Sequence, residues 1–235
     1  MICIAGLIQA RMGSSRLPGK VMLPIRSKPM IGHIIDRLQR VEGLAGIVVA
    51  TTTDPRNDAL VAYAQSREAD VYREKIEDDI AARLLGAARL MRADAVLKIN
   101  GDCPLADPAV LQKLTDVFRA VADADYVSNK IEWTYPEGLS AEVIATRALD
   151  WCALHLTDPG ERELVANYVR DHRERFKTVS VTGSQDLSRH RWVVDTPEDF
   201  SFVSRIFDAL SPQGSIFSMH EILQAIENIH NHSAN

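Results

Sequence analysis

Short apolar runs alternate with segments of helical periodicity along the first half of the chain. The runs predict strands at 2–8, 47–51, 70–72, 95–99 and 126–128. Several are apolar on both faces, as strands of a parallel sheet covered by helices should be. Between them the 3.6-residue period predicts helices at 30–40, 57–67, 79–92 and 108–121. This alternation predicts an α/β fold of Rossmann-like type, in which helices flank an open, mostly parallel sheet.

The helix predicted at 30–40 is strongly amphipathic. Its apolar face consists of Ile31, Ile34, Ile35 and Leu38. We expect the opposite face, with Asp36, Arg37 and Arg40, to be solvated, and His33 to lie on its polar side.

The pattern changes after about residue 128. A segment containing Pro136 and Gly138 precedes predicted strands at 141–144, 177–181 and 191–194. Helices are predicted at 146–156, 160–171, 197–209 and 219–228, and the polar end, 230–235, should be frayed. With no internal repeat or low-complexity stretch, we expect one domain spanning 1–235.

The composition excludes several classes of protein. Hydrophobic residues at 46% and charged residues at 25% are ordinary for a globular chain, not for a disordered or coiled-coil one. The longest apolar run is far shorter than the roughly 20 residues that a membrane span needs, and the first strand lacks the features of a signal peptide. Cys3, Cys103 and Cys152 form no CxxC pair, so neither a disulfide framework nor a zinc site is indicated and the cytoplasm is the expected location.

The net charge of -5 is unevenly distributed. Residues 1–40 sum to +6 and the remaining 195 to -11. A mildly acidic chain with a basic N-terminal sixth is a poor candidate for a nucleic-acid coat, and is better suited to binding a small anion such as phosphate.

The loop after the first strand, 9–20, concentrates groups that bind phosphate. Two glycines permit close backbone approach, two serines offer donors, and three cations supply charge. These residues are Gly13, Gly19, Ser14, Ser15, Arg11, Arg16 and Lys20. The loop is not a Walker A motif, because five residues separate its glycines and Val21 stands where a metal-binding Ser or Thr is needed. No GxGxxG follows the strand either, and a merely solvated basic loop stays an alternative.

Two acids follow predicted strand ends. Asp102 comes after the strand at 95–99, and Asp195 after the strand at 191–194. Magnesium prefers hard oxygen ligands that it shares with phosphates, so the pair predicts a magnesium site opposite the basic loop. Alternatively, Asp102 belongs to a turn and Asp195 to the start of the next helix, where Thr196 and Asp199 form a capping-box-like pair.

At this point the sequence resembles the cytidylyltransferases that activate acidic sugars. The closest match is the group of spore coat polysaccharide biosynthesis protein F, related to CMP-KDO synthetases and acylneuraminate cytidylyltransferases. The matching stretches are IQARMGSSRLPGKVML (8–23), KPMIGHIIDRL (28–38), VVATTTDPRNDAL (48–60), EDDIAARLLGAA (77–88), KINGDCPLADP (98–108), YPEGLSAEV (135–143) and DLSRHRWVVDTPEDF (186–200).

The resemblance implies a nucleotide-diphospho-sugar-transferase-like fold with a small inserted hairpin. Within it, the segment of about 130–185 would bind the acceptor and form the contact of a homodimer. It implies CTP and an acidic sugar as substrates, Mg²⁺ as cofactor, and no nucleic-acid or membrane partner. By position, the triphosphate would be held by Arg11, Gly13, Ser14, Arg16 and Lys20. Arg83 would lie near the cytidine, Asn100 near the acceptor, and Asp102 and Asp195 would bind the metal. Glu142, next to the Pro/Gly segment, either contacts the acceptor or belongs with Glu137 to a dimer-forming hairpin. Arg11, Lys20 and Asp102 would be catalytic.

The departures from the group concentrate on the acceptor side. Ser140 replaces an acid, Ala82 stands where an Asp is common, and 161–168 reads ERELVANY in place of EREHVTPY. The expected reaction is transfer of CMP from CTP to an acidic sugar, with release of pyrophosphate, for surface polysaccharide biosynthesis.

Three alternatives stay open. The acceptor could instead be a phosphorylated or phosphonate compound, or the chain could be a non-catalytic nucleotide-binding protein. A glycosyltransferase is disfavoured because Gly101-Asp102-Cys103 holds one acid where an Asp-x-Asp motif has two. The choice of CTP over other nucleotides rests on the resemblance.

Overall fold

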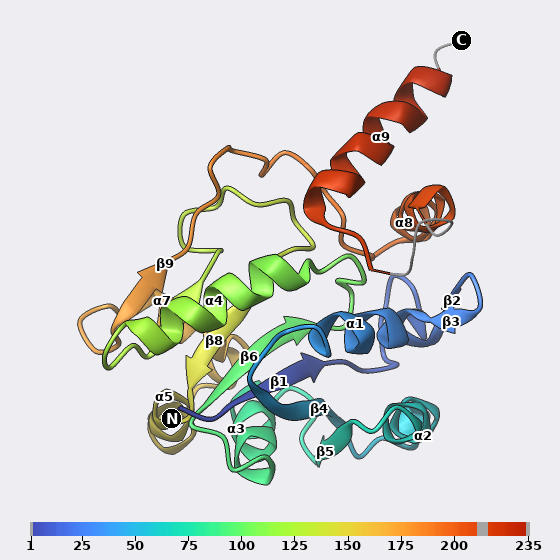
Figure 1. Cartoon of the computed structure of the whole chain (residues 1–235). Coiled ribbons are helices and arrows are strands. Elements are labelled where there is room, and N and C mark those ends of the chain that lie inside the picture. Colours follow the sequence, from blue (N-terminus) through green and yellow to red (C-terminus); the bar gives the residue numbers. More distant parts are fainter. Residues whose placement is uncertain (1, 211–215, 234–235) are drawn as a thin grey trace.

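The computed structural model describes residues 2–210 and 216–233 of the chain. In that part of the chain, a seven-stranded sheet of order β5-β4-β1-β6-β8-β7-β9 forms the middle layer (Figure 1). Its parallel half consists of β5 (Asp70–Glu74), β4 (Leu44–Thr52), β1 (Ile4–Gln9) and β6 (Ala95–Asn100). The other half consists of β8 (Glu142–Ala145), which is antiparallel to both neighbours, β7 (Tyr126–Ser128) and β9 (Thr178–Ser180). The mostly parallel α/β fold expected from the sequence is confirmed.

Helices cover both faces of this sheet. On one face lie α1 (Met30–Leu38) and α4 (Pro108–Ala120), and on the other lie α3 (Ile80–Leu90) and α5 (Thr146–His155) (Figure 1). The remaining helices are α2 (Asp58–Ser66), α6 (Pro159–Glu163), α7 (Val165–Asp171), α8 (Pro197–Leu210) and α9 (Met219–Ser233). Two 3₁₀ turns, η1 (Lys20–Met22) and η2 (Pro55–Asn57), and a small hairpin, β2 (Pro24–Ile25) with β3 (Lys28–Pro29), complete the elements.

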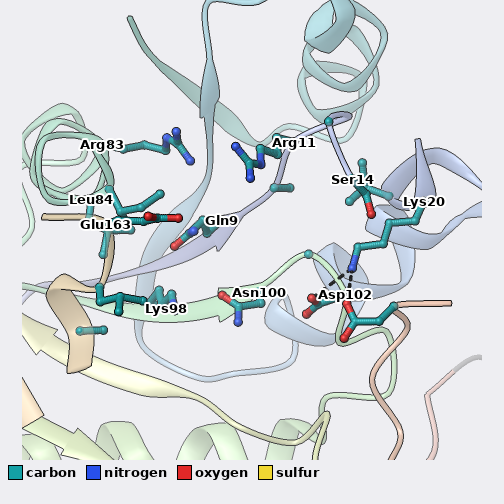
Figure 2. A pocket seen from close by; sticks show the side chains of 18 of the residues that line it. Gln9, Arg11, Ser14, Lys20, Arg83, Leu84, Lys98, Asn100, Asp102 and Glu163 are labelled. Atoms are coloured by element: carbon teal, nitrogen blue, oxygen red, sulfur yellow. Dashed lines mark hydrogen bonds and ion pairs between the residues drawn. The ribbon is translucent and has the colours of Figure 1, made fainter. Parts of the chain in front are cut away.

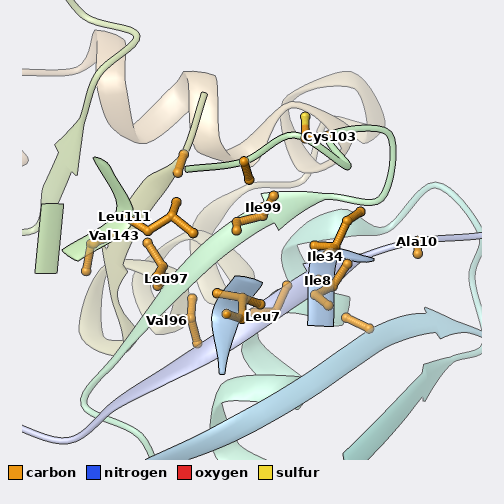
Figure 3. Packing of buried hydrophobic residues seen from close by; sticks show 14 of the residues in the cluster. Leu7, Ile8, Ala10, Ile34, Val96, Leu97, Ile99, Cys103, Leu111 and Val143 are labelled. Atoms are coloured by element: carbon orange, nitrogen blue, oxygen red, sulfur yellow. The ribbon is translucent and has the colours of Figure 1, made fainter. Parts of the chain in front are cut away.

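The core lies between the sheet and its helices. Ile8 of β1 and Leu97 of β6 are fully buried on one face of the sheet, with Ile34 of α1 and Leu111 of α4 packed beside them (Figure 3). Burying an aliphatic side chain of this size contributes roughly 1.5–3 kcal/mol, so the apolar runs that predicted the strands also stabilise the layers.

The predicted elements agree with the observed ones to within a few residues, with three exceptions. The helix predicted at 160–171 is divided at Leu164 into α6 and α7. The last helix continues to Ser233, through most of the tail that we expected to be frayed, while 234–235 lie outside the described residues. The third exception is the predicted strand at 191–194.

That segment is not a strand. Within the described residues its one ladder contact is an isolated bridge between Glu137 and Arg191. Trp192, Val193 and Val194 are buried, but their amides reach separate partners: the Trp192 N–H donates to the Glu137 carbonyl at 2.6 Å and the Val194 N–H to the Asp102 carbonyl at 2.9 Å. Burial of the side chains explains the apolar run without any sheet pairing.

The predicted solvated face of α1 is also wrong in part. Arg37 is 0% exposed, and its guanidinium donates to the carbonyls of Ala106 and Phe217, both at 3.1 Å. It also lies over the rings of Phe207 and Phe217, and burial lowers the pKa of Arg37 to about 10. His33 is buried against Phe207 as well. Phe207 of α8 and Phe217, just before α9, cover this side of α1, whereas Arg40 is exposed as expected.

Candidate active site

The site forms where the sheet reverses its strand order. β1 and β6 are adjacent and parallel, with Gln9 paired to Asn100 at their carboxyl ends. After β1 the chain builds outward on one side of that strand, and β6 is later added on the other side. In open α/β sheets such a switch point leaves a crevice above the strand ends. A cavity of about 530 Å³ opens there, lined by the loop after β1, the end of β6, α3 and residues 163–167.

The loop after β1 is held by its own backbone. The Met12 carbonyl accepts hydrogen bonds from the amides of Ser14 and Gly19, both at 3.0 Å, and the Ser14 hydroxyl accepts one from Leu17 N–H at 3.3 Å. Gly19 adopts a left-handed conformation with φ 71°, which glycine reaches without steric cost, and Lys20 begins η1 directly after it. Gly13 and Ser14 line the cavity.

Lys20 brings the two predicted acids together. Its ammonium Nζ lies 2.8 Å from Asp195 Oδ1 and 3.3 Å from Asp102 Oδ2, and donates to the Val194 carbonyl at 2.8 Å. Figure 2 shows Lys20 reaching down from its loop to Asp102 at the end of β6. Asp102 and Asp195 are 93 positions apart in the sequence, yet their carboxylates converge on one cation.

Asp195 is held in place by several contacts. The Val194 N–H bond to Asp102 fixes the backbone beside it, and the predicted capping box is present: Asp199 N–H donates to Thr196 Oγ1 at 3.2 Å, and Thr196 N–H to Asp199 Oδ2 at 3.0 Å. Partial burial acts to raise the pKa of Asp195, but Lys20, Arg191 and Arg16 outweigh it and hold that pKa below its usual value.

The three cations of the loop do not form one cluster. Arg16 Nη2 joins the acids, 3.0 Å from Asp195 Oδ2, and its side chain is 62% exposed. Arg11 turns the other way, with Nη1 2.7 Å from Glu77 Oε1. Arg83 of α3 lies near Arg11 (Figure 2); it is 1% exposed and donates to the Glu77 carbonyl. Burial and the charge of Arg11 lower the pKa of Arg83. The cavity therefore has cations at two ends.

Asn100 and Glu142 lie along the floor of the cavity. Glu142 of β8 is 2% exposed and is the register partner of Lys98 on β6. Its carboxylate pairs with Lys98 Nζ at 3.2 Å and with Lys130 Nζ at 3.7 Å. Burial acts to raise the pKa of Glu142, but the two lysines outweigh it and lower that pKa.

The sequence reasoning missed Lys98, Lys130 and Arg191. Lys98 had a signal, since it is a lone charge within the apolar strand Ala95–Asn100. Arg191 contacts Glu137 at 2.5 Å and Asp195 at 2.9 Å, and so connects the Pro/Gly segment to the acids. Nothing in the sequence indicates that Arg191 pairs with these two acids.

Cys103 has no features of a nucleophile. Its side chain is buried, and burial together with the adjacent Asp102 carboxylate raises its pKa well above the usual value for a thiol. Its Sγ donates a hydrogen bond to Asp102 Oδ1 at 3.3 Å.

Sequence comparison places the chain among known proteins. A family model described as "Cytidylyltransferase" matches residues 5–146. An uncharacterised protein of Methanocaldococcus jannaschii is 31% identical over 84% of this chain and 80% of its own length. The spore coat polysaccharide biosynthesis protein SpsF of Bacillus subtilis is 25% identical over 86% of this chain and 85% of its own. An 8-amino-3,8-dideoxy-manno-octulosonate cytidylyltransferase of Shewanella piezotolerans is 40% identical, over 48% of this chain and 46% of its own.

Solved structures are similar to the chain as well. A cytidylyltransferase from Leptospira borgpetersenii is 28% identical with a TM-score of 0.90, over 100% of this chain and 96% of that one. A CMP:2-keto-3-deoxy-manno-octonic acid synthetase complexed with CTP, 21% identical, has the same fold, with a TM-score of 0.66 over 88% of this chain and 98% of that one. The cavity at the ends of β1 and β6, its phosphate-suited loop and the family match over more than half of the chain lead to one conclusion: this chain belongs to the cytidylyltransferase family and is a nucleotidyltransferase enzyme.

Proposed function

We propose that the enzyme transfers CMP from CTP to a hydroxyl of an acidic sugar of the nonulosonate or KDO type, with release of pyrophosphate. The observation that carries the proposal is the convergence of Asp102, Asp195, Lys20 and Arg16 at the ends of β1 and β6. Acids and cations in this arrangement can bind a metal–triphosphate at one end of the cavity, which leaves the other end for the base and the acceptor.

The triphosphate would bind along the loop after β1. Lys20 and Arg16 are held by carboxylates in the structure, so we propose that they turn to the phosphates when the nucleotide enters. Gly13 would allow close backbone approach, Ser14 would donate its hydroxyl, and Arg11 would release Glu77 for a phosphate oxygen. Arg83, next to Arg11 and buried, would contact the cytidine.

The donor set fits a divalent cation. Two carboxylates already converge on the Lys20 ammonium, which stands in for a cation, and their hard oxygens suit Mg²⁺. Among the described residues no three potential ligands of the His, Cys, Asp and Glu types gather, so Asp102 and Asp195 would hold the ion together with phosphate oxygens. Once bound, Mg²⁺ would neutralise charge at the α-phosphate. A Mycobacterium tuberculosis protein of the same fold, 22% identical with a TM-score of 0.57 over 86% of this chain and 97% of that one, has been solved with manganese.

The transfer needs positioning and charge neutralisation. The acceptor oxygen forms a bond to the α-phosphorus while the bond to the bridging oxygen breaks, and that electron pair leaves with pyrophosphate. Arg11, Arg16 and Lys20 would stabilise this leaving group, and Asn100 would orient the acceptor beside Asp102. The attacking hydroxyl loses its proton to water, so a sufficiently acidic hydroxyl requires no protein base.

A panel of substrates tests the proposal. Pyrophosphate release is measured with Mg²⁺ and CTP, UTP, ATP or GTP, each with 2-keto-3-deoxy-manno-octonic acid, its 8-amino analogue, a sugar phosphate or a phosphonate. We expect release with CTP and a sugar acid. Release only with the phosphate or phosphonate would move the proposal to that acceptor class, which the altered residues at 140 and 161–168 keep as the second candidate. CTP binding without release from any acceptor would favour a non-catalytic protein.

We further propose that 1–235 is one domain and that the segment 130–185 contacts a second copy of the chain. Leu154 and Leu164 in this segment are 77% and 57% exposed, and a contact with a second copy of the chain would bury apolar surface at these positions. Light scattering should give twice the monomer mass. Cys3, Cys103 and Cys152 are unpaired in the structure, and we propose the cytoplasm as the location. Within the described residues, no helix is both long and apolar enough to cross a membrane.

A further inference from the structure

A second charged group lies on the cavity floor, separate from the acids at Lys20. It consists of Lys98 on β6, Glu142 on β8 and Lys130 just after β7. The three side chains are 11%, 3% and 23% exposed, so two ammonium groups and one carboxylate share a largely dehydrated space. Two cations against one anion leave this group with a net charge of +1.

Both lysines line the cavity. Lys98 and Asn100 are two positions apart on β6, so their side chains project from the same face of the sheet. Figure 2 shows Lys98 of β6 on one side of Asn100 and Asp102, just past the end of β6, on the other. A ligand that occupies the space beside Asn100 therefore reaches Asp102 with one end and Lys98 with the other.

Glu142 cannot neutralise both lysines equally. Lys98 Nζ lies 3.2 Å from Oε2, whereas Lys130 Nζ lies 3.7 Å from Oε1, beyond ordinary hydrogen-bond distance. Lys130 is also the more exposed of the two lysines. Its ammonium is therefore the less tightly paired of the two and the better able to take a new anionic partner.

We propose that Lys98 and Lys130 bind the anionic group of the acceptor, and that Glu142 is a positioning residue which holds the two ammonium groups at the cavity floor. This inference rests on the proposed function, because it assigns the acceptor end of that same site. The shared ligand chemistry is a small oxyanion, a sugar carboxylate or a phosphate, attached to the carbon skeleton that carries the attacking hydroxyl. The lysines select for that charge at a point distant from Asp102.

The test measures binding of acceptor probes to the enzyme loaded with CTP and Ca²⁺, an ion used to slow turnover. Calorimetry compares 2-keto-3-deoxy-manno-octonic acid, its uncharged methyl ester, and glycerol 3-phosphate. The wild-type enzyme should bind at least one of the charged probes and bind the ester about tenfold more weakly, the cost of one charge-assisted hydrogen bond. Preference for the sugar acid identifies a carboxylate site, and preference for glycerol 3-phosphate a phosphate site.

Lys130→Met should lower the affinity for the preferred charged probe about tenfold and leave the affinity for the ester unchanged. Lys113→Met is the matched control, because Lys113 is an exposed lysine of α4 outside the cavity. This substitution should change the affinity for neither the charged probe nor the ester. Glu142→Gln separates positioning from direct contact. Removing its charge raises the net charge of the group, so affinity for the charged probe should hold or rise, whereas a glutamate that itself bound the acceptor's hydroxyls would lose both probes.

CTP binding is measured in every variant. Failure of the wild-type enzyme to bind CTP would contradict the proposed function. Retained CTP binding with equal affinity for the ester and both charged probes, or with no binding of either charged probe, would overturn the lysine assignment alone. If Glu142→Gln fails to fold, Lys130→Met still tests the role of the lysines, because this substitution leaves the closer Lys98–Glu142 pair intact.

Discussion

Asp102→Asn separates chemistry from folding at the proposed metal site. The Asp102 side chain is 22% exposed and contacts Lys20 Nζ and Cys103 Sγ, both at 3.3 Å. After the substitution Lys20 keeps its 2.8 Å contacts to Asp195 and the Val194 carbonyl. The lost interaction is long and partly solvated, so the free energy of unfolding should fall by about 1 kcal/mol or less. For a chain of this size that lowers Tm by about 2–4 °C at most.

The effect on activity should be far larger. An amide has the size of the carboxylate but no charge, so one of two proposed metal ligands is lost while the cavity keeps its shape. Removing a single group that stabilises charge in the transition state costs about 10²–10³ in kcat, or roughly 3–4 kcal/mol, and loss of a metal ligand should cost at least as much. The gain in CTP affinity on adding Mg²⁺ should also disappear.

Two measurements check this prediction. Calorimetry gives CTP affinity with and without Mg²⁺, and pyrophosphate release gives the rate with the best acceptor of the panel. Asp116→Asn, an exposed acid on α4, is the control and should behave as wild type. A rate within threefold of wild type, together with an unchanged Mg²⁺ effect on CTP binding, would refute the role given to Asp102.

Three further predictions concern other parts of the site. Arg83→Met should weaken CTP binding about tenfold by calorimetry, because a buried cation beside the nucleotide is lost; unchanged affinity would remove Arg83 from the site. Gly138→Ala should destabilise the fold by about 2–4 kcal/mol in denaturant unfolding, since φ is +105° and the new Cβ would lie 2.6 Å from the Trp192 carbonyl carbon; an unchanged midpoint would contradict this. The lowered pKa of Asp195 means that its stabilisation is present above its usual value of 3.8 and is lost as pH falls through the lower folded value. Between pH 6 and 2.5 the free energy of unfolding should therefore fall less in Asp195→Asn than in wild type. Equal falls would contradict a lowered pKa of Asp195.

Local features of the sequence predicted most of the secondary structure because their causes are local. Apolar runs and 3.6-residue periods reflect which side chains must leave water, and they locate β1, β6, α3 and α4 to within a few residues. The capping box at Thr196 and Asp199 needs only a spacing of three residues. The failures at 191–194 and on the polar face of α1 have one cause, since burial there comes from segments distant in the sequence.

The candidate site divides in the same way. The sequence by itself determined its ingredients, a basic loop after the first strand and acids at 102 and 195, because each follows a recognisable element. Only the tertiary structure decided the partners: Lys20 with both acids, Arg11 with Glu77, and Lys98 with Glu142. Ion pairs depend on distances of a few ångströms between side chains, and the strand register and backbone hydrogen bonds that set those distances join residues far apart in the chain.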